Sequence, residues 1–176
     1  MDPDDDTTAE YDLARRVGER LRDREETVAV AESCTGGLVG AQFTAVPGSS
    51  DYVDRAVVTY AYDAKREVLG VPREALDAEG AVSEPVALAM ARGARDRADV
   101  DWGLATTGVA GPTGGTPETP VGTVYVALAH AAEWGSGDSY AEATRYEFEG
   151  DRATVRRQTV AVALETLDEA VPDGDS

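Results

Sequence analysis

The chain has 176 residues, of which 42% are hydrophobic, and it carries 34 acidic against 16 basic residues, for a formal net charge of −18. This length and apolar content predict one domain, 1–176, that buries roughly 70% of its unfolded surface, with only 1–7 and 172–176 disordered. With one cysteine, Cys34, and one histidine, His130, the sequence excludes an internal disulfide and the usual Cys/His zinc clusters. We therefore expect neither a bound metal nor a cofactor. The alternative is a metal site formed by carboxylates alone, which the counts of cysteine and histidine do not exclude.

The acidic charge also narrows the choice of partners. Affinity for nucleic acid depends on lysine and arginine that neutralise phosphates, so we expect no nucleic-acid partner. No apolar run approaches the ~20 residues of a membrane span, and the start, MDPDDDTTAE, has no basic n-region. We therefore expect a cytoplasmic protein with no membrane partner. An acidic surface over a folded core is typical of proteins kept soluble in concentrated salt, which predicts a halophilic protein.

Two helices and a buried strand are predicted in the first 45 residues. A Thr7-x-x-Glu10 capping box predicts a helix whose apolar residues recur at helical spacing as far as Leu21. The apolar, β-branched run at 28–31 is typical of a central strand that is covered on both faces. A second helix is expected over 38–45. This alternation of helix and strand favours an α/β fold.

The segment between that strand and the second helix, 33–37, consists of hydroxyls, a thiol and two glycines (SCTGG). Glycines allow a tight turn with accessible N–H groups, so this loop is a candidate reactive segment. The alternative is a structural turn in which Ser33 or Thr35 only caps the helix. Cys34 is a rival nucleophile to Ser33. Adjacent residues of an extended segment point in opposite directions, so the two side chains cannot both face a site, and a small buried residue is the more ordinary role for Cys34.

The lone lysine of the chain follows the second predicted strand. That strand is expected at 57–60, before a short helix that carries Lys65 and stops at Gly70. Arginine effectively cannot lose its proton, whereas a buried lysine can, so Lys65 is either a general base or an accidental surface lysine. Two more helices are predicted, one from Pro72 and one over 83–98.

A second glycine-rich segment, 106–123, contains five glycines and three prolines. Such a loop is rigid at its prolines and open at its glycines, which suits close approach of a ligand. Its glycine spacing matches neither the dinucleotide-binding pattern nor the P-loop. The other predicted elements are a strand at 102–106, a strand at 121–129, a half-exposed edge strand at 140–148 and a last helix capped by Asp151.

Polar side chains follow three of the predicted strands: Ser33 the first, Tyr60 and Lys65 the second, and Thr107 the third. If these strands are parallel, as the intervening helices indicate, the side chains converge at the sheet edge where α/β proteins form sites. No acid near Ser33 suggests a triad with His130, so Ser33 with Lys65 is the economical pairing. A neutral Lys65 would accept the Ser33 proton, Tyr60 or Thr107 would relay or orient it, and glycine N–H groups would stabilise the oxyanion.

Five sequence motifs span most of the chain in a characteristic order. They are AESCTGG at 31–37, PGSS at 47–50, VTYxxxAKxxxLGV at 58–71, TTGVAGPTGGTxxxPVGTVYVA at 106–127 and GDRxxVRxxT at 150–159. With them the chain resembles the C-terminal domain of the competence-damage-inducible protein CinA, which also occurs alone as nicotinamide-nucleotide amidohydrolase. The elements and the resemblance together predict a three-layer α/β/α sandwich with a mixed, mainly parallel sheet.

The resemblance implies that nicotinamide mononucleotide is deamidated to nicotinic acid mononucleotide and ammonia by a Ser-Lys mechanism in a homo-oligomer. It places the catalytic roles on Ser33, Lys65, Tyr60 and Thr107. The implied substrate-binding residues are Thr35, Gly36, Gly37, Ser50, Gly108, Gly111 and Arg145, with Ser50 in the pocket wall and as an alternative nucleophile. For the substrate phosphate, Arg145, Arg152 and Arg55 are candidates, although surface ion pairing is the more ordinary role for each.

The sequence departs from the family pattern beside the expected site. Family members often have glycine near Arg55 and Ala56, asparagine at the position of Tyr62 and lysine at the position of Thr119. These departures bear on the choice of substrate more than on the fold. Because some isolated domains of the family resemble accessory modules, the alternative function is a non-catalytic nucleotide-binding or regulatory module that uses the same pocket. A nucleic-acid-associated competence factor is disfavoured by the charge.

Overall fold

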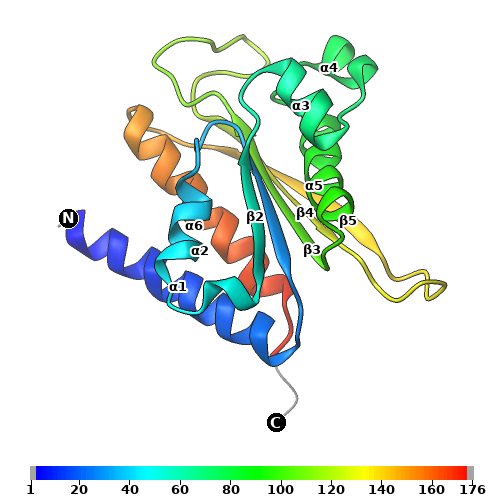
Figure 1. The fold of residues 1–176 in the computed structure, drawn as a ribbon. Helices are drawn as coiled ribbons and strands as arrows, with labels where there is room; N and C mark the ends of the chain where they lie inside the picture. The colour runs from blue at the N-terminus through cyan, green and yellow to red at the C-terminus, as the bar shows by residue number, and fades with distance from the viewer. Residues whose placement is uncertain (1–2, 174–176) are drawn as a thin grey trace.

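The computed structural model describes residues 3–173, with side chains from residue 8 onward. Its strands are β1 (Val28–Glu32), β2 (Val53–Val58), β3 (Trp102–Gly108), β4 (Thr123–His130) and β5 (Tyr140–Glu147). They form one sheet in the order β2-β1-β3-β4-β5, between two layers of helices (Figure 1). The predicted three-layer α/β/α architecture is confirmed.

The sheet is mixed, with a parallel portion that contains the candidate site. β1 pairs in parallel with both β2 and β3, whereas β4 is antiparallel to β3 and β5 is antiparallel to β4. Four of these five strands therefore point in the same direction, as predicted. Because β1, β2 and β3 are parallel neighbours, their carboxyl ends meet at the same edge of the sheet.

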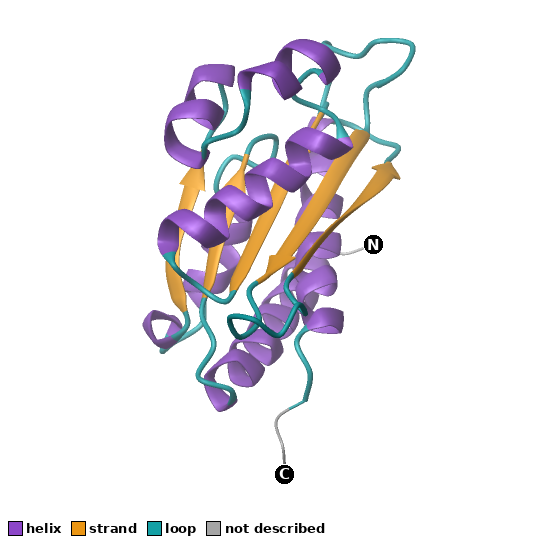
Figure 2. Ribbon diagram, turned by 90° about the vertical axis from the view of Figure 1, so that its right-hand side faces the viewer, coloured by secondary structure: helices purple, strands orange, loops and turns teal. Residues whose placement is uncertain are grey.

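Helices cover both faces of the sheet. They are α1 (Pro3–Asp23), α2 (Leu38–Ala45), α3 (Tyr62–Leu69), α4 (Arg73–Glu79), α5 (Glu84–Ala98) and α6 (Arg152–Ala170), and a 3-10 helix, η1 (Ser49–Asp51), precedes β2. α1, α2 and α6 cover one face, whereas α5 crosses the other diagonally, with α3 and α4 near the carboxyl edge (Figures 1 and 2). The chain thus leaves β1 toward one face and β2 toward the other, which is the arrangement at which open α/β sheets bind ligands.

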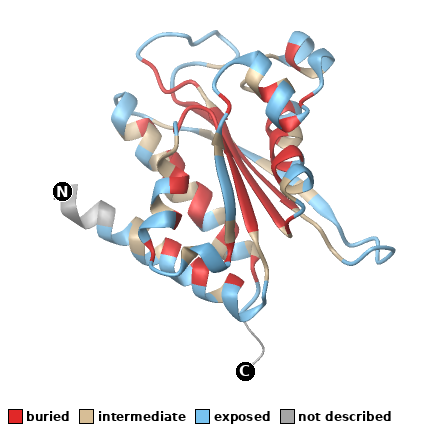
Figure 3. Ribbon diagram, in the orientation of Figure 1, coloured by how far each residue is buried: buried red, intermediate tan, exposed pale blue. Residues whose placement is uncertain are grey.

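The unbroken apolar run of β1 is explained by burial on both faces (Figure 3). Val28 and Val30 pack beneath α1, α2 and α6. Ala29 and Ala31 pack in the second core, beneath α5, where small side chains allow the helix to approach the sheet. The prediction of a central strand covered on both faces is confirmed.

The second strand begins earlier than predicted and ends earlier. It spans Val53–Val58 rather than 57–60, and it is an edge strand whose residues 54–56 are exposed. Exposed strand residues need not be apolar, so the charged pair Asp54 and Arg55 hid the start of the strand from the apolar pattern. Tyr60 consequently lies beyond the strand, in the connection to α3.

At the amino end, α1 begins at Pro3, before the Thr7 capping box that predicted its start. The expected disorder of 1–7 and 172–176 falls in part on residues 1–2 and 174–176, which lie outside the described range. Among the described residues, no helix combines the length and apolar character needed to cross a bilayer.

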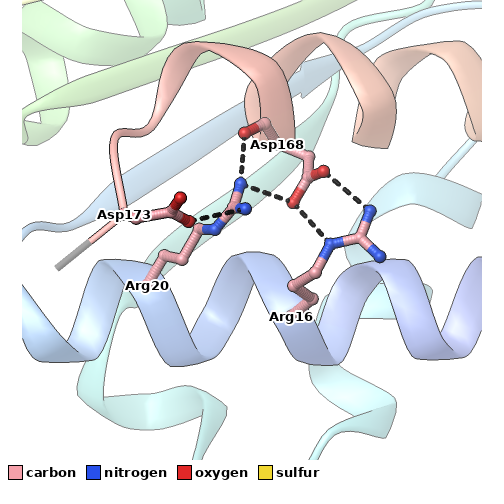
Figure 4. A network of polar contacts seen from close by, with 4 residues as sticks. All are labelled: Arg16, Arg20, Asp168 and Asp173. Carbon is pink, nitrogen blue, oxygen red and sulfur yellow. Dashed lines mark hydrogen bonds and ion pairs between the residues drawn. The ribbon is translucent and has the colours of Figure 1, made fainter.

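An ion-pair network joins α1 to the carboxyl end of the chain (Figure 4). Arg16 contacts the Asp168 carboxylate through two nitrogens, at 3.0 and 2.7 Å. Arg20 donates to the same carboxylate at 3.0 Å and to the Asp168 carbonyl oxygen at 2.6 Å, and it pairs with Asp173 at 2.7 Å. The Asp168 side chain is only 13% exposed, so solvent and salt screen these contacts less than they screen an ordinary surface pair.

We expect Asp168→Ala to lower the free energy of unfolding by about 1–3 kcal/mol, because it removes charged hydrogen bonds and leaves Arg20 partly buried without them. Urea unfolding measures the change. Asp77→Ala is the matched control, since Asp77 forms an exposed pair with Arg73 one turn away on α4 and should contribute less than about 0.5 kcal/mol. Equal losses in the two variants would contradict a stabilising role for the network.

Candidate active site

Ser33 is the first residue after β1 and lies between the ends of the two neighbouring strands. Its N–H donates to the carbonyl oxygen of Thr106 on β3 at 3.0 Å. The preceding carbonyl, that of Glu32, accepts a hydrogen bond at 2.8 Å from the N–H of Thr59, which follows β2. Backbone pairing on both sides thus fixes the position of the serine, which is 8% exposed.

Lys65 reaches the serine from α3. Its Nζ contacts Ser33 Oγ at 3.0 Å, and it donates to the carbonyl oxygens of Thr59 at 2.6 Å and Tyr60 at 3.0 Å. The Lys65 side chain is fully buried. The predicted convergence of Ser33 and Lys65 at the carboxyl edge is therefore what the structure shows.

The local sequence of α3 directs Lys65 toward β1. Lys65 and Leu69 are one turn apart on the buried face of this eight-residue helix. The helix ends at Gly70, whose φ of 71° lies in the left-handed region and whose N–H donates to the carbonyl oxygen of Arg66 at 2.9 Å. This short, sharply ended helix keeps the lysine beside the strand that precedes it.

The surroundings of Lys65 make its ammonium easier to deprotonate than that of a lysine in solvent. Burial lowers the pKa of Lys65 to about 8. Among the described residues, the ion pairs are formed by arginine, and none gives the Lys65 ammonium a carboxylate partner. A lysine in this environment loses its proton far more readily than one in solvent.

The contacts of Nζ also orient the amine. A neutral amine has two N–H donors and one lone pair. If the two N–H groups point at the carbonyl oxygens of Thr59 and Tyr60, the lone pair faces Ser33 Oγ. With the amine neutral, this geometry would allow Lys65 to accept a proton from the serine hydroxyl.

Glu32, the last residue of β1, organises the loop that carries Ser33, and the sequence reasoning missed it. Its fully buried carboxylate accepts hydrogen bonds from the Thr35 hydroxyl at 2.6 Å and from the amides of Gly37, Val39 and Gly40 at 2.9, 3.1 and 2.9 Å. This carboxylate, rather than Ser33 or Thr35, caps the amino end of α2. A lone acid that ends an apolar strand just before a glycine-led helix was the available signal.

The structure assigns the loop residues Thr35, Gly36 and Gly37 to internal contacts. The Thr35 side chain is fully buried against Glu32 and Thr106. The Gly36 amide donates to the Ser33 carbonyl oxygen at 3.2 Å, and the Gly37 amide is bound to Glu32. Both glycine amides are thus engaged within the loop, so this arrangement does not offer either of them as a donor to an oxyanion, and a role for glycine N–H groups in stabilising an oxyanion stays a prediction.

Cys34, the residue after the serine, is buried and only 4% exposed. It packs in the core with Val39 and Val155, and burial raises the pKa of its thiol to about 12. A thiol with this pKa is protonated near neutrality and is a poor nucleophile. The interpretation of Cys34 as a small buried residue is supported.

Tyr60 and Thr107 flank the Ser33–Lys65 pair but do not direct their hydroxyls to it. The Tyr60 ring is 59% exposed, and its hydroxyl accepts a hydrogen bond from Arg152 Nη2 at 3.1 Å. The buried hydroxyl of Thr107 donates to the Ala81 carbonyl oxygen at 2.8 Å. In this arrangement Tyr60 contacts Lys65 through its main-chain carbonyl oxygen. The Thr107 hydroxyl is bound to the connection between α4 and α5.

The second glycine-rich segment approaches the site from β3. Gly108 ends that strand, where a Cβ would lie 2.7 Å from the Val124 side chain, so a larger residue would not fit. The carbonyl oxygen of Gly111 accepts a hydrogen bond from Arg152 Nη1 at 2.7 Å. Gly111 thus contacts the arginine that also binds Tyr60.

Two of the predicted site residues lie away from Ser33. Ser50 precedes β2, whose first residue pairs with Val28, so it lies at the opposite edge of the sheet, roughly 17 Å along the strands. It lines an open hollow of about 490 Å³ between α2 and β2, which extends to Gly37. Arg145 is on β5, three strand spacings or roughly 14 Å from β1, and is bound to Glu147 and the Glu118 carbonyl oxygen. The separation of Arg145 depends on strand order, whereas that of Ser50 follows from strand direction, because Ser50 precedes a strand that is parallel to β1.

Sequence comparisons place the chain among known proteins. Residues 10–171 match the family model of the CinA C-terminal domain. A CinA-like protein of Anaeromyxobacter sp. (strain K) is 53% identical over 156 residues, which is 89% of this chain and 36% of that protein. A putative competence-damage inducible protein of Symbiobacterium thermophilum is 51% identical over 88% of this chain and 37% of its own length. The chain thus spans little more than a third of these relatives.

Solved structures agree with this match over nearly their whole length. The competence/damage inducible protein CihA from Agrobacterium tumefaciens is 41% identical, with a TM-score of 0.84 over 90% of this chain and 93% of that one. A CinA superfamily protein from Klebsiella pneumoniae is 36% identical, also with a TM-score of 0.84, over 92% of this chain and 97% of that one. From its matched residues and its fold, the chain belongs to the CinA C-terminal domain family.

Proposed function

We propose that this protein is a metal-independent amidohydrolase in which Ser33 is the nucleophile and Lys65 the general base. One observation carries the proposal: a fully buried lysine contacts a serine hydroxyl at 3.0 Å while two main-chain carbonyl oxygens orient its amine. A structural lysine would gain more from a carboxylate partner, whereas a base needs a lone pair directed at the nucleophile.

The first half of the reaction forms an acyl-enzyme. Neutral Lys65 takes the proton of Ser33 Oγ as that oxygen attacks the carbonyl carbon of a carboxamide. The resulting tetrahedral intermediate collapses when the Lys65 ammonium returns the proton to the leaving nitrogen. The C–N bond breaks, ammonia leaves, and the acyl group stays on Ser33 as an ester.

The second half regenerates the enzyme. Neutral Lys65 accepts a proton from water, whose oxygen attacks the ester carbon. The proton then passes to Ser33 Oγ, and a carboxylic acid leaves. Lys65 thus acts as base and then as acid in each half, which suits a pKa near 8.

The substrate is proposed from the family resemblance, which points to the carboxamide of nicotinamide mononucleotide. The test is to incubate the purified protein with this nucleotide and to measure ammonia and nicotinic acid mononucleotide. Stoichiometric release of both supports the proposal. Binding of the nucleotide without release would favour the alternative, a non-catalytic nucleotide-binding or regulatory module. The expected homo-oligomer, cytoplasmic location and halophilic character stay predictions.

Activity should survive exhaustive treatment with EDTA, because Ser33 and Lys65 supply both the nucleophile and the base. No group of three or more His, Cys, Asp and Glu side chains in the described part of the chain is arranged to bind a metal ion. The measurement is the rate of ammonia release before and after chelation. Loss of activity that a divalent cation restores would show that the reaction uses a metal site.

A further inference from the structure

One sequence motif has no part in the chemistry proposed above: GDRxxVRxxT at 150–159, which begins α6. The Asp151 carboxylate caps the helix by accepting a hydrogen bond from the Thr154 amide at 2.8 Å. Val155 is buried in the core beneath the sheet. These contacts explain the start and the inward face of the helix, but not its two arginines, Arg152 and Arg156, which lie one turn apart on the same side.

Arg156 contacts the loop that carries the nucleophile. Its Nη2 donates to the carbonyl oxygen of Thr35, two residues after Ser33, at 2.8 Å. The loop packs directly on the guanidinium, since a Cβ at Gly36 would lie 3.2 Å from Nη2. The Arg156 Nε is buried and has no hydrogen-bond partner among the described residues. The guanidinium is therefore turned into the protein rather than toward solvent.

Arg152 joins the two other segments that border the site. Its Nη1 donates to the carbonyl oxygen of Gly111, in the loop after β3, at 2.7 Å. Its Nη2 donates to the Tyr60 hydroxyl at 3.1 Å, and the Tyr60 carbonyl oxygen is itself an acceptor for Lys65. One planar side chain thus connects the loop after β3 with the connection after β2.

We propose that Arg152 and Arg156 are positioning residues, which set the relative placement of the three segments that follow β1, β2 and β3. Within this inference, which rests on the proposed function, Tyr60 presents its exposed ring beside the site while Arg152 binds its hydroxyl. Within this inference neither arginine is the phosphate anchor, because Nη1 and Nη2 of Arg152 and Nη2 of Arg156 donate to protein oxygens and the Arg156 Nε is buried. Arginine suits the role since its rigid fork can serve two separate acceptors and keeps its charge at every relevant pH.

The two arginines should have different kinetic effects. Arg156 contacts the loop of the nucleophile at Thr35, so its loss should loosen residues 34–37 and allow the Ser33 side chain to turn away from Lys65, which reduces kcat. Arg152 contacts the outer loop and the Tyr60 ring, so its loss should weaken substrate binding and raise KM. Neither change should move the pKa of Lys65, because neither side chain contacts its Nζ.

The experiment compares Arg152→Met and Arg156→Met with the control Arg157→Met, which removes an exposed arginine from the same turn of α6. We expect kcat to fall about 10- to 100-fold in Arg156→Met with KM little changed, and KM to rise about 10-fold in Arg152→Met. Arg156→Lys should recover most of kcat, because one donor suffices for one carbonyl. Arg152→Lys should not recover KM, because a lysine does not bridge two acceptors.

Two further measurements separate positioning from other roles. The first uses nicotinamide riboside, which lacks the phosphate. If the arginines position the loops, the fall in kcat and the rise in KM persist with this substrate. If either effect disappears, that arginine is a phosphate anchor and the inference is overturned. Peptide amide exchange should be about 10-fold faster over 33–37 in Arg156→Met and over 109–121 in Arg152→Met. Equal losses in Arg157→Met, or unchanged exchange in both loops, would also refute positioning. If the wild-type protein releases no ammonia, the proposed function fails. Amide exchange in the two loops still tests whether the arginines position them, because it does not depend on activity.

Discussion

Ser33→Ala is expected to lower amide hydrolysis by at least about 10³-fold while the thermal unfolding midpoint stays close to that of the wild type. The serine oxygen forms the covalent bond to the substrate, and alanine offers no replacement. The stability change should be small because two nearby main-chain hydrogen bonds do not depend on the serine hydroxyl. One runs from the Ser33 N–H to the Thr106 carbonyl oxygen, and the other from the Thr59 N–H to the Glu32 carbonyl oxygen. Ammonia release and circular dichroism measure the two quantities.

Cys34→Ala is the control for this prediction. The Cys34 thiol is buried, and with a pKa near 12 it stays protonated, so its removal should leave kcat within about threefold of the wild type at a modest cost in stability. If Ser33→Ala kept full activity while Cys34→Ala lost it, the nucleophile would be the cysteine and the assignment would be wrong.

The second large effect is expected at Lys65, through the pH dependence of kcat/KM. A general base must be neutral, and burial lowers the pKa of Lys65 to about 8. The deprotonated fraction increases as pH rises through that value, so kcat/KM should climb from about pH 7 and level off above about pH 9. Steady-state kinetics from pH 6 to 10, in concentrated salt to suit an acidic surface, measures the profile.

Lys65→Arg distinguishes a proton acceptor from a charge anchor. Arginine retains the positive charge but does not lose its proton, so this variant should be nearly as inactive as Lys65→Ala, at least about 10³-fold below the wild type. If Lys65 only neutralises the substrate phosphate, arginine would restore much of kcat/KM, and the acidic limb of the profile would remain in the variant. That result would exclude Lys65 as the base.

Local sequence signals determined most of the elements. The predicted helix over 83–98 corresponds to α5, Glu84–Ala98, and the Asp151 cap is observed at α6. These elements could be predicted because caps, prolines and apolar periodicity act within a few residues of one another. β2 was harder to delimit, because an edge strand lacks the apolar pattern on which strand prediction depends.

The pairing of Ser33 with Lys65 was also accessible from the sequence. Each residue follows a predicted strand, and parallel neighbouring strands bring their carboxyl ends to one edge. Chain order and helical connections were therefore enough to place the two side chains together. The composition of the chain added an independent signal, because Lys65 is its one lysine.

The tertiary structure alone decided which groups surround that pair. The Arg156–Thr35 contact spans 121 residues and the Arg152–Tyr60 contact spans 92, so no local pattern encodes them. Strand order, rather than sequence spacing, separates Arg145 from the site, and strand direction places Ser50 at the opposite edge. Apolar periodicity, caps and chain order in the sequence thus specify the helices and strands and the sheet edge at which they end. The hydrogen-bond partners of the site depend instead on how the layers pack in space.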